Sequence, residues 1–308
     1  MRHIWTVNTL LFSLLVISSQ GHGQDFSQDF SQVKKPRLEG RYLGQKPPGL
    51  TAEPFAPSIV NTHDWGDAGH FSPDMNEFYV IRWRVNNGKR ETQSVSFKKV
   101  DHGWQQTATP YTSHIPFDSP DGKTQYFGAQ YRELTETGWS EMKSLGPAFE
   151  AIRIMGLTAS RNGTLVLDEM GASDGDGVIR YSRLVDGKHQ APKPLPEAIN
   201  TGKWNAHPFI AADESYLIWN SERESGYGDT DLYISFRQPD GAWGEAINLG
   251  NEVNTKAEEG GAQVTPDGKY LFFNRMVPQA GSDGEPQSDL YWIDAQIIEQ
   301  LRPKTLSL

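Results

Sequence analysis

Cysteine is absent from the 308 residues of this chain. Its absence excludes disulfides, and it excludes a bacterial lipid anchor, which needs a cysteine at the cleavage site. The chain also lacks a Gly-x-Ser-x-Gly elbow and a His-Glu-x-x-His pair. These motifs mark serine hydrolases and zinc-dependent proteases, so neither class of enzyme is indicated. Packing alone must hold the folded chain together.

Basic residues are scarce relative to acidic ones, with 29 Lys and Arg against 39 Asp and Glu and a formal net charge of −10. Residues 1–23 contain one arginine and no acid, so their removal would change the charge from −10 to −11. A chain of this charge is repelled by nucleic-acid phosphates and by anionic lipid head groups. We therefore expect no nucleic-acid partner.

Long apolar runs are also rare, and the clearest one occupies residues 10–17. Arg2 precedes this run and small or polar residues follow it, which is the layout of a secretory signal peptide. The run is too short to span a bilayer. We predict a signal peptide over residues 1–23 and a disordered linker over residues 24–42, where the repeat Gln-Asp-Phe-Ser occurs twice. The mature chain is then periplasmic or secreted, without membrane insertion.

A short turn motif recurs along the chain, in its fullest form as Ser-Pro-Asp-Gly-Lys at residues 119–123. Proline presets φ at the second position, Asp or Asn bonds to its own backbone, and Gly adopts the left-handed conformation that closes a hairpin. An apolar run follows each copy, so the motif is expected to join the first two strands of a repeated unit. Steps of 47, 41, 51 and 54 residues separate the third turn residues, Asp74, Asp121, Asn162, Asp213 and Asp267.

Two further landmarks complete the repeated unit. The tripeptide Asp-Leu-Tyr begins at Asp231 and again at Asp289, where a third strand is expected. Gly-Trp at residues 103–104 and 138–139, and Gly-Ala-Trp at residues 241–243, precede a fourth strand. Four short strands per unit, repeated radially, predict an all-β fold: a single β-propeller of five four-stranded blades. Six blades, or a solenoid of stacked hairpins, are the alternatives.

The two ends of the repeat are predicted to meet in one blade. The fifth unit ends after Trp292 without a fourth strand, whereas residues 55–62 resemble the end of a fourth strand and its exit at residues 246–255. We therefore expect an N-terminal strand to complete the last blade and close the ring, which removes the exposed edges of an open sheet. The propeller would extend over residues 43–302, followed by a C-terminal tail at residues 303–308.

The turn at residues 119–123, the two Asp-Leu-Tyr strands and the Gly-Trp pairs together resemble the WD-repeat-like units of the TolB-type β-propeller family, in its exported members. The resemblance covers nearly the whole mature chain, and it implies the fold rather than an activity. Many members of the family are envelope scaffolds, and others are fused to peptidases or act on sugars. TolB-type propellers commonly have six blades, so a count of five departs from the family pattern.

In a propeller the first strand of each blade lines the central channel, so residues a few positions before each turn motif are expected at a channel mouth. Trp65, Trp204 and Glu258 occupy equivalent positions in their units, whereas the third unit offers only apolar residues and glycine there. Arginines just after the second strands could lean over the same rim. The candidate ligand-binding residues are Asp64, Trp65, Asp67, His70, His114, Trp204, His207, Glu258, Glu259, Arg223 and Arg275.

Histidines and carboxylates at a shared mouth could bind a divalent cation or a sugar, with tryptophan faces stacking on the sugar ring. The alternative, which we favour for most of them, is that these groups hydrogen-bond to backbone and hold neighbouring blades together. Residues 173–177 resemble part of a calcium loop, but they lack its terminal glutamate, and an ordinary hairpin loop is favoured. Ca²⁺ is therefore the one cofactor considered, and no metal ligand is assigned.

The sequence favours an exported, non-enzymatic and monomeric propeller that binds an envelope protein or a glycan through its channel mouth or its side surface. The alternative is a carbohydrate-active enzyme, a glycoside hydrolase or a lyase, with its site at the mouth. Such an enzyme needs two carboxylates that meet in space. Asp64 or Asp67 with Glu258 or Glu259 would be the pair.

Overall fold

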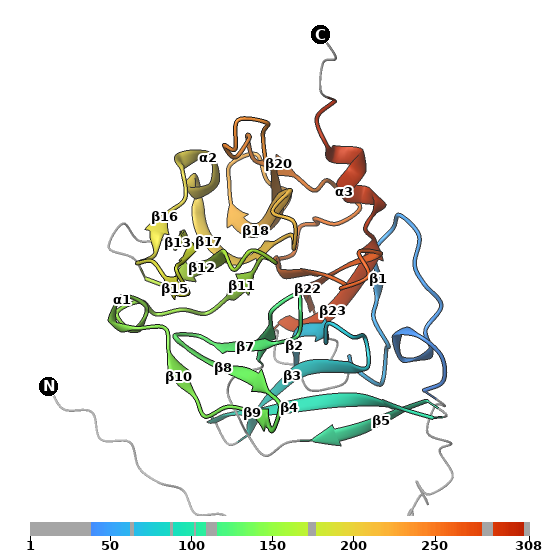
Figure 1. Cartoon of the computed structure of the whole chain (residues 1–308). Coiled ribbons are helices and arrows are strands. Elements are labelled where there is room, and N and C mark those ends of the chain that lie inside the picture. The colour runs from blue at the N-terminus through green and yellow to red at the C-terminus, as the bar shows by residue number, and fades with distance from the viewer. Residues whose placement is uncertain are drawn as a thin grey trace, which may run out of the picture. The chain divides into compact units, whose positions relative to one another are not determined.

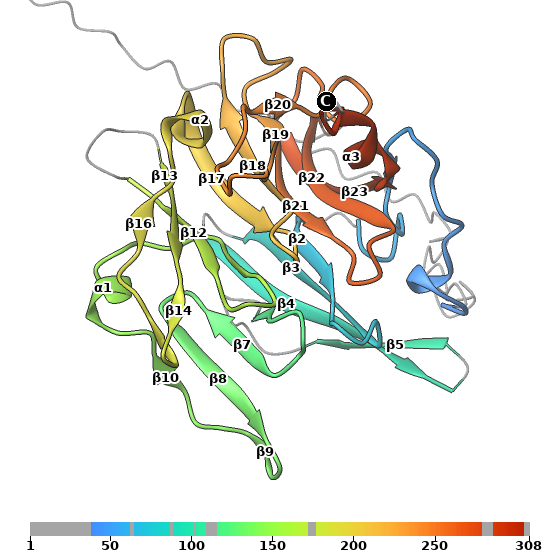
Figure 2. The ribbon, with the colours of Figure 1, turned by 45° about the horizontal axis from the view of Figure 1, so that its top comes forward.

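The computed structural model describes residues 38–61, 65–86, 89–101, 103–108, 116–171, 177–278 and 286–304. Within the compact unit formed by residues 37–308, five antiparallel sheets follow one another around a central axis (Figures 1 and 2). The fold is therefore a five-bladed β-propeller, as the repeat predicts. Among the described residues, no helix is long and apolar enough to cross a membrane.

The first three blades follow one another in the sequence. Blade 1 has the order β2 (Trp65–Phe71), β3 (Glu77–Asn86), β4 (Lys89–Val100), β5 (Gly103–Ala108). Blade 2 has the order β6 (Phe117–Asp118), β7 (Thr124–Phe127), β8 (Gln130–Thr135), β10 (Lys143–Ser144), and β9 (Gly138–Trp139) also pairs with β8. Blade 3 has the order β11 (Leu157–Ala159), β12 (Leu165–Glu169), β13 (Val178–Ser182), β16 (Lys193–Pro194), with a side hairpin of β14 (Leu184–Val185) and β15 (Lys188–His189).

The last two blades contain the Asp-Leu-Tyr strands. Blade 4 has the order β17 (Lys203–Ile210), β18 (Tyr216–Glu222), β19 (Asp231–Phe236), β20 (Ile247–Asn248). Blade 5 has the order β21 (Glu259–Val264), β22 (Tyr270–Pro278), β23 (Pro286–Asp294), β1 (Glu53–Pro54). The helical segments are short: η2 (Tyr42–Gly44), α1 (Pro147–Glu150), α2 (Glu197–Asn200) and α3 (Gln296–Leu301).

The turn motif joins the first and second strands of every blade, as predicted. In blade 2, the Ser119 hydroxyl donates a hydrogen bond of 2.6 Å to Asp121, which also accepts one of 3.0 Å from the backbone N–H of Lys123. Gly122 has a φ of 69°, in the left-handed region that glycine adopts most easily. The side chains of Ser119 and Asp121 and the backbone of Gly122 therefore stabilise the tight reversal between two strands.

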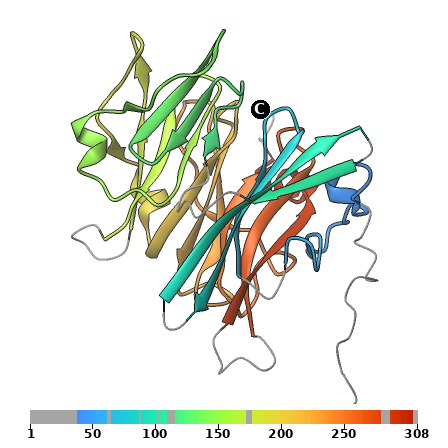
Figure 3. The same cartoon turned by 90° about the horizontal axis from the view of Figure 1, so that it is seen from below.

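An N-terminal strand closes the ring, as predicted. In β1, Glu53 and Pro54 pair with Trp292 and Tyr291 of β23. Figure 3, seen from below, shows the sheets of blades 1 and 5 side by side. Their side chains pack together, with the rings of Phe71 on β2 and Phe272 on β22 centred 5.9 Å apart. Blade 5 thus combines strands from both ends of the repeat.

Three asparagines fix the segments that leave the fourth strands. Asn254 accepts a hydrogen bond of 2.8 Å from the backbone N–H of Leu232 and donates one of 2.9 Å to the carbonyl of the same residue. Asn61 makes the same pair of bonds with Leu290 at 2.8 and 2.9 Å, and Asn200 does so with Ile179 at 2.8 and 3.0 Å. This shared contact explains why residues 55–62 resemble residues 246–255.

The packed part of the chain begins before residue 43. Tyr42, which the sequence placed at the end of the linker, is buried, and its ring lies 4.9 Å from that of Tyr270 in an edge-on contact. Its hydroxyl donates a hydrogen bond of 2.7 Å to Asp267 in the fifth turn. Leu38 also packs against this cluster. Residues 38–42 thus contribute to the core of the propeller.

Candidate functional site

The first strand of each blade contributes one residue to a ring of five side chains inside the channel. Each of these residues lies four positions before the Asp or Asn of its turn motif, so the five positions are equivalent in the repeat. The ring separates two cavities, because His70, Phe117 and Gln263 line both of them. We name the face that carries the turn motifs the turn side, and the opposite face the loop side. The ring consists of His70, Phe117, Thr158, Phe209 and Gln263.

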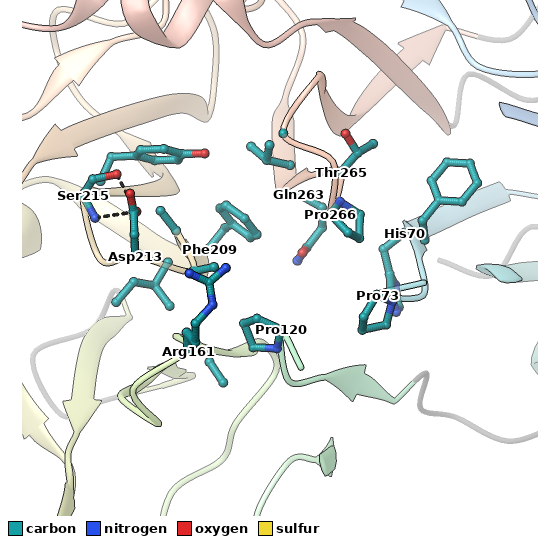
Figure 4. A pocket seen from close by; sticks show the side chains of 18 of the residues that line it. His70, Pro73, Pro120, Arg161, Phe209, Asp213, Ser215, Gln263, Thr265 and Pro266 are labelled. Carbon is teal, nitrogen blue, oxygen red and sulfur yellow. Dashed lines mark hydrogen bonds between the residues drawn. The ribbon is translucent and has the colours of Figure 1, made fainter. Parts of the chain in front are cut away.

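The larger cavity opens on the turn side and has a volume of about 470 Å³. The second residue of every turn motif lines it, so all five blades contribute one residue to its mouth (Figure 4). Four of these positions hold proline or alanine, and the third blade places an arginine there. The mouth is formed by Pro73, Pro120, Arg161, Ala212 and Pro266.

Arg161 extends its exposed side chain into this cavity (Figure 4). Its backbone N–H donates a hydrogen bond of 2.8 Å to the carbonyl of Ala212, which fixes the turn of blade 3 against that of blade 4. Among the described residues, the guanidinium group makes no hydrogen bond or ion pair. A guanidinium group in a concave site presents five N–H donors to a bound ligand.

Three carboxyl groups line the same cavity, those of Asp118, Asp213 and Glu299. Glu299 pairs with Arg302 at 2.7 Å, which lowers its pKa. The pKa values of the other two are displaced in opposite directions. Burial raises the pKa of Asp118, and the hydrogen bond from Gln125 and the nearby His70 offset this only in part. One Asp118 oxygen accepts a bond of 2.8 Å from Gln125, and the other, Oδ2, is buried without a hydrogen-bond partner among the described residues. Burial also acts on Asp213, but hydrogen bonds of 2.6 and 3.0 Å from Ser215 outweigh it and lower the pKa.

The smaller cavity, of about 160 Å³, lies on the loop side, where the sequence places the ligand-binding residues. His207 lines it, and Trp204 lies three residues earlier on β17 with 54% of its surface exposed. Glu258 is exposed at the equivalent level of blade 5. Trp204, His207 and Glu258 therefore lie on the predicted side of the channel.

Glu259 lies in the wall of the propeller rather than at the mouth, and none of its surface is exposed. Its carboxylate accepts hydrogen bonds from Thr255, at 2.6 Å from the hydroxyl and 3.0 Å from the N–H, and one of 2.7 Å from Arg275. Burial raises the pKa of Glu259 despite these partners. Arg275 also donates to the carbonyl of Val253 at 2.7 Å and lies 4.4 Å above the ring of Tyr291.

Arg223 has the same role in blade 4. It donates a hydrogen bond of 3.0 Å to the carbonyl of Ile199 and lies 4.6 Å from the centre of the Tyr233 ring. Ile199 and Val253 both precede the asparagines that fix the strand exits. Arg223 and Arg275 thus connect each exit segment to the next blade, which matches the alternative that such groups hold blades together.

Several predicted positions are not described in full. Asp64 and His114 lie outside the described residues, as do residues 173–176 of the acidic loop. Trp65 and Asp67 lie at the start of β2, where they pair with Trp83 and Ile81 of β3. The predicted carboxylate pair therefore stays a prediction. Within the described ranges, no three His, Asp or Glu residues are grouped closely enough to hold a metal ion.

The turn-side cavity did not emerge from the sequence, although one signal for it was present. Arg161 departs from the Ser-Pro-Asp pattern of the turns at residues 72–74 and 119–121. An arginine at the position of a turn proline does not restrict φ, so its presence indicates a role other than turn formation. Asp118 carries no such signal, because its burial depends on the neighbouring blade.

By sequence, the chain matches no protein-family model and no curated protein. Among solved structures, the catalytic domain of a Coprinopsis cinerea GH62 α-L-arabinofuranosidase aligns over 83% of this chain and 97% of that one, at 8% identity and a TM-score of 0.45. A Podospora anserina α-L-arabinofuranosidase in complex with cellotriose aligns over 80% and 98%, at 12% identity and a TM-score of 0.47. The β-propeller domain of the Trilobed protease of Pyrococcus furiosus aligns over 76% and 69%, at 12% identity and a TM-score of 0.35.

The five-bladed fold rests on the strand pairing of this chain. The resemblance to the TolB-type family stays a prediction.

Proposed function

We propose that this protein is an exported β-propeller that binds a glycan in its turn-side cavity. The observation that carries the proposal is the guanidinium group of Arg161, which extends into that cavity and makes no hydrogen bond or ion pair with another described residue. A charged side chain loses conformational freedom when it is held in a concave site. A ligand that accepts its hydrogen bonds compensates for that loss.

The lining of the cavity matches the chemistry of a sugar. Phe209 and Tyr216 supply aromatic surface, on which the apolar face of a sugar ring can stack. Gln263 and Asp213 supply polar groups for its hydroxyls, and the side chain of Gln263 is directed into the cavity (Figure 4). A volume of about 470 Å³ lies within the range of small-molecule sites, roughly 300–1,000 Å³.

Binding is tested with the variant Arg161→Ala. A glycan array identifies ligands of the wild-type chain, and titration calorimetry then measures their affinity for both proteins. We expect a loss of at least about tenfold, because a hydrogen bond to a charged group contributes roughly 1.5–3 kcal/mol. Arg153→Ala is the matched control, because Arg153 is also an exposed arginine of blade 3 but does not line this cavity. Equal affinities for the three proteins would contradict the proposal.

A carbohydrate-active enzyme is the second candidate, and the opposed pKa shifts of Asp118 and Asp213 favour it. Two carboxyl groups whose environments separate their pKa values can act as acid and base. In a glycoside hydrolase, Asp118 would protonate the glycosidic oxygen as its bond to the anomeric carbon breaks, water would add to that carbon, and Asp213 would accept a proton from the water. A reducing-sugar assay on the array ligands, with Asp118→Asn as the inactive variant, separates turnover from binding.

Export is part of the proposal, and it is supported by the basic start and the apolar run within residues 1–23. Fractionation of cells that produce the full chain tests it, because a shortened product should be recovered from the periplasm or the medium. Recovery of the uncut chain from the cytoplasm would contradict export. An envelope protein, rather than a free glycan, would be identified by crosslinking from the turn side.

A further inference from the structure

Two residues at the loop side have backbone conformations that their side chains disfavour. Trp204 has a φ of 52° and His207 a φ of 48°, both in the left-handed region. β17 contains β-bulges here, between Lys203 and Ala206 and between Ala206 and Phe209. The equivalent position in blade 5, six residues before the Asp of the turn, is Gly261, which has a φ of 64° and lies in a bulge of its own strand. The repeat thus accommodates this conformation with glycine in blade 5 and with histidine in blade 4.

A left-handed conformation at a bulky residue costs about 1–3 kcal/mol and persists only where neighbouring groups hold it. Asp168, which is fully buried, does this for His207. One of its oxygens accepts a hydrogen bond of 2.9 Å from the His207 N–H, and the other accepts bonds of 2.8 and 3.0 Å from the N–H groups of Met155 and Gly156. A carboxylate on blade 3 therefore fixes the backbone of blade 4.

Asn220 fixes the imidazole ring. Its amide group donates to the carbonyl of Trp204 at 3.3 Å, so its oxygen faces Nδ1 of His207 at 3.0 Å. Because an amide oxygen only accepts, Nδ1 of a neutral His207 must carry the proton, which leaves Nε2 as an acceptor. The tautomer and the orientation of the ring are thus set by one buried side chain.

Small residues leave room beside His207. Gly156 and Gly261 lie at the same level of blades 3 and 5, and all three line the cavity of about 160 Å³. A Cβ atom on Gly156 would come within 3.0 Å of the His207 Cα. The imidazole therefore borders a recess that larger neighbours would fill, and Trp204 presents an exposed ring at the start of the same strand.

We propose that this recess is a second sugar-binding site, separate from the turn-side cavity. Nε2 of His207 accepts a hydrogen bond from a sugar hydroxyl, and the exposed face of Trp204 stacks on a sugar ring. Asp168 and Asn220 are positioning residues: they hold the backbone and the ring of His207 and the backbone of Trp204 in the conformation that binds the sugar. The channel ring separates the two sites, so each can be occupied while the other is empty.

The substitution His207→Gly tests the inference sharply, because stability and binding respond to it differently. Glycine relieves the strained φ, as it does at position 261, and this relief offsets the loss of the bond to Asn220, so the melting temperature is expected to stay about the same. Loss of the imidazole is expected to weaken sugar binding at this site about tenfold or more. A purely structural histidine would instead lower the melting temperature on removal. That result would overturn the inference, and so would unchanged binding.

The probes are cellotriose as a neutral sugar and trigalacturonate as an acidic one. Protein labelled with ¹⁵N at histidine reports the site directly, and the Nε2 resonance of His207 is identified by its absence in His207→Gly. We expect this resonance to shift when one of the probes is added, and Trp204→Ala to weaken that probe about three- to tenfold. No shift with either probe would overturn the inference.

Arg161→Ala keeps this test independent of the proposed function. We expect the His207 shift to persist in that variant, because Arg161 lines only the turn-side cavity of the two. If Arg161→Ala removed the shift, there would be a single site and the inference would fail. If the shift persisted but Arg161→Ala changed no other binding, the loop-side site would stand and the turn-side proposal would fail.

Discussion

Asn254 holds Leu232 by both of its backbone polar groups, with bonds of 2.8 Å from the N–H and 2.9 Å to the carbonyl. Asn61 and Asn200 hold Leu290 and Ile179 in the same way. The contact joins the exit of one fourth strand to the third strand of the same blade. In blade 5 it also joins the two ends of the repeat, so it contributes to ring closure.

Asn254→Ala removes both bonds and leaves the N–H of Leu232 unpaired, whereas the Leu232 carbonyl keeps its bond of 3.0 Å from the N–H of Leu249. We expect the free energy of unfolding to fall by about 1–3 kcal/mol, the cost of one unsatisfied buried group. Urea denaturation measures the loss. Asn76→Ala is the control, because Asn76 is exposed and its side chain bonds only to Asp74 of its own turn. Equal losses for the two variants would show that the asparagine contact is not a structural support.

Glu259→Gln separates a role in the wall from a role in ligand binding. Breaking a buried ion pair by neutralising one partner costs roughly 3–5 kcal/mol. We expect a loss of this size at Glu259, which pairs with Arg275 at 2.7 Å. Glu299→Gln affects a pair of the same length at the surface and should cost below about 1 kcal/mol. A stable Glu259→Gln protein that has lost glycan binding would contradict the assignment to the wall.

Tyr42→Ala tests whether the segment before residue 43 belongs to the core. Truncation of a buried aromatic side chain costs about 3–5 kcal/mol, and the hydrogen bond to Asp267 is lost as well. Tyr227→Ala is the matched control, because 49% of Tyr227 is exposed. Thermal unfolding of both variants gives the comparison. A melting temperature of Tyr42→Ala equal to that of the control would place Tyr42 outside the cooperative unit.

Acid should destabilise the propeller through its turns. Burial acts to raise the pKa of Asp121, but the hydrogen bonds from Ser119 and Lys123 outweigh it, so the pKa lies below its ordinary value of 3.8. A group with a lowered folded-state pKa contributes stability that is fully present above 3.8 and is lost as the pH falls through the folded value. Urea midpoints between about pH 6 and pH 2 should therefore fall at the acid end. Asp121→Asn should lower stability at pH 6 and flatten this dependence, and an unchanged slope would contradict it.

The fold could be predicted because its signals are local. Each turn motif is stabilised by its own residues, as Ser119, Asp121 and Gly122 illustrate. The motif can therefore be recognised in the sequence without knowledge of the neighbouring blades. The missing fourth strand after Trp292 then required a partner from elsewhere in the chain. Residues 55–62 could be identified because Asn61 repeats the context of Asn254.

The positions of single side chains were less predictable. Alternation along a strand decides which side chains face the channel, and a one-residue shift reverses the faces. β21 contains such a shift between Gly260 and Gln263. Glu258 and Glu259, adjacent in sequence, are accordingly exposed and fully buried. A site position predicted by counting residues back from the turn motif takes no account of a bulge between the motif and that position, so the predicted face of the strand can be wrong.

The linker boundary at residue 42 depended on composition alone. A polar stretch predicts disorder only where no cavity in the fold accepts its apolar residues, and Tyr42 fits among Phe71, Tyr270 and Trp292. Arg161 could have been singled out as an exception to the turn pattern. That Arg161 lies at the mouth of a cavity could not be predicted, because the cavity forms only where the five turns meet in the folded chain.

A crystal structure of the chain with the highest-affinity sugar from the glycan array tests the central claim most directly. We predict electron density for a sugar ring in the turn-side cavity, with an oxygen within about 3 Å of the Arg161 guanidinium group. Density for the sugar at the outer side of the blades, with the turn-side cavity holding only water, would contradict it.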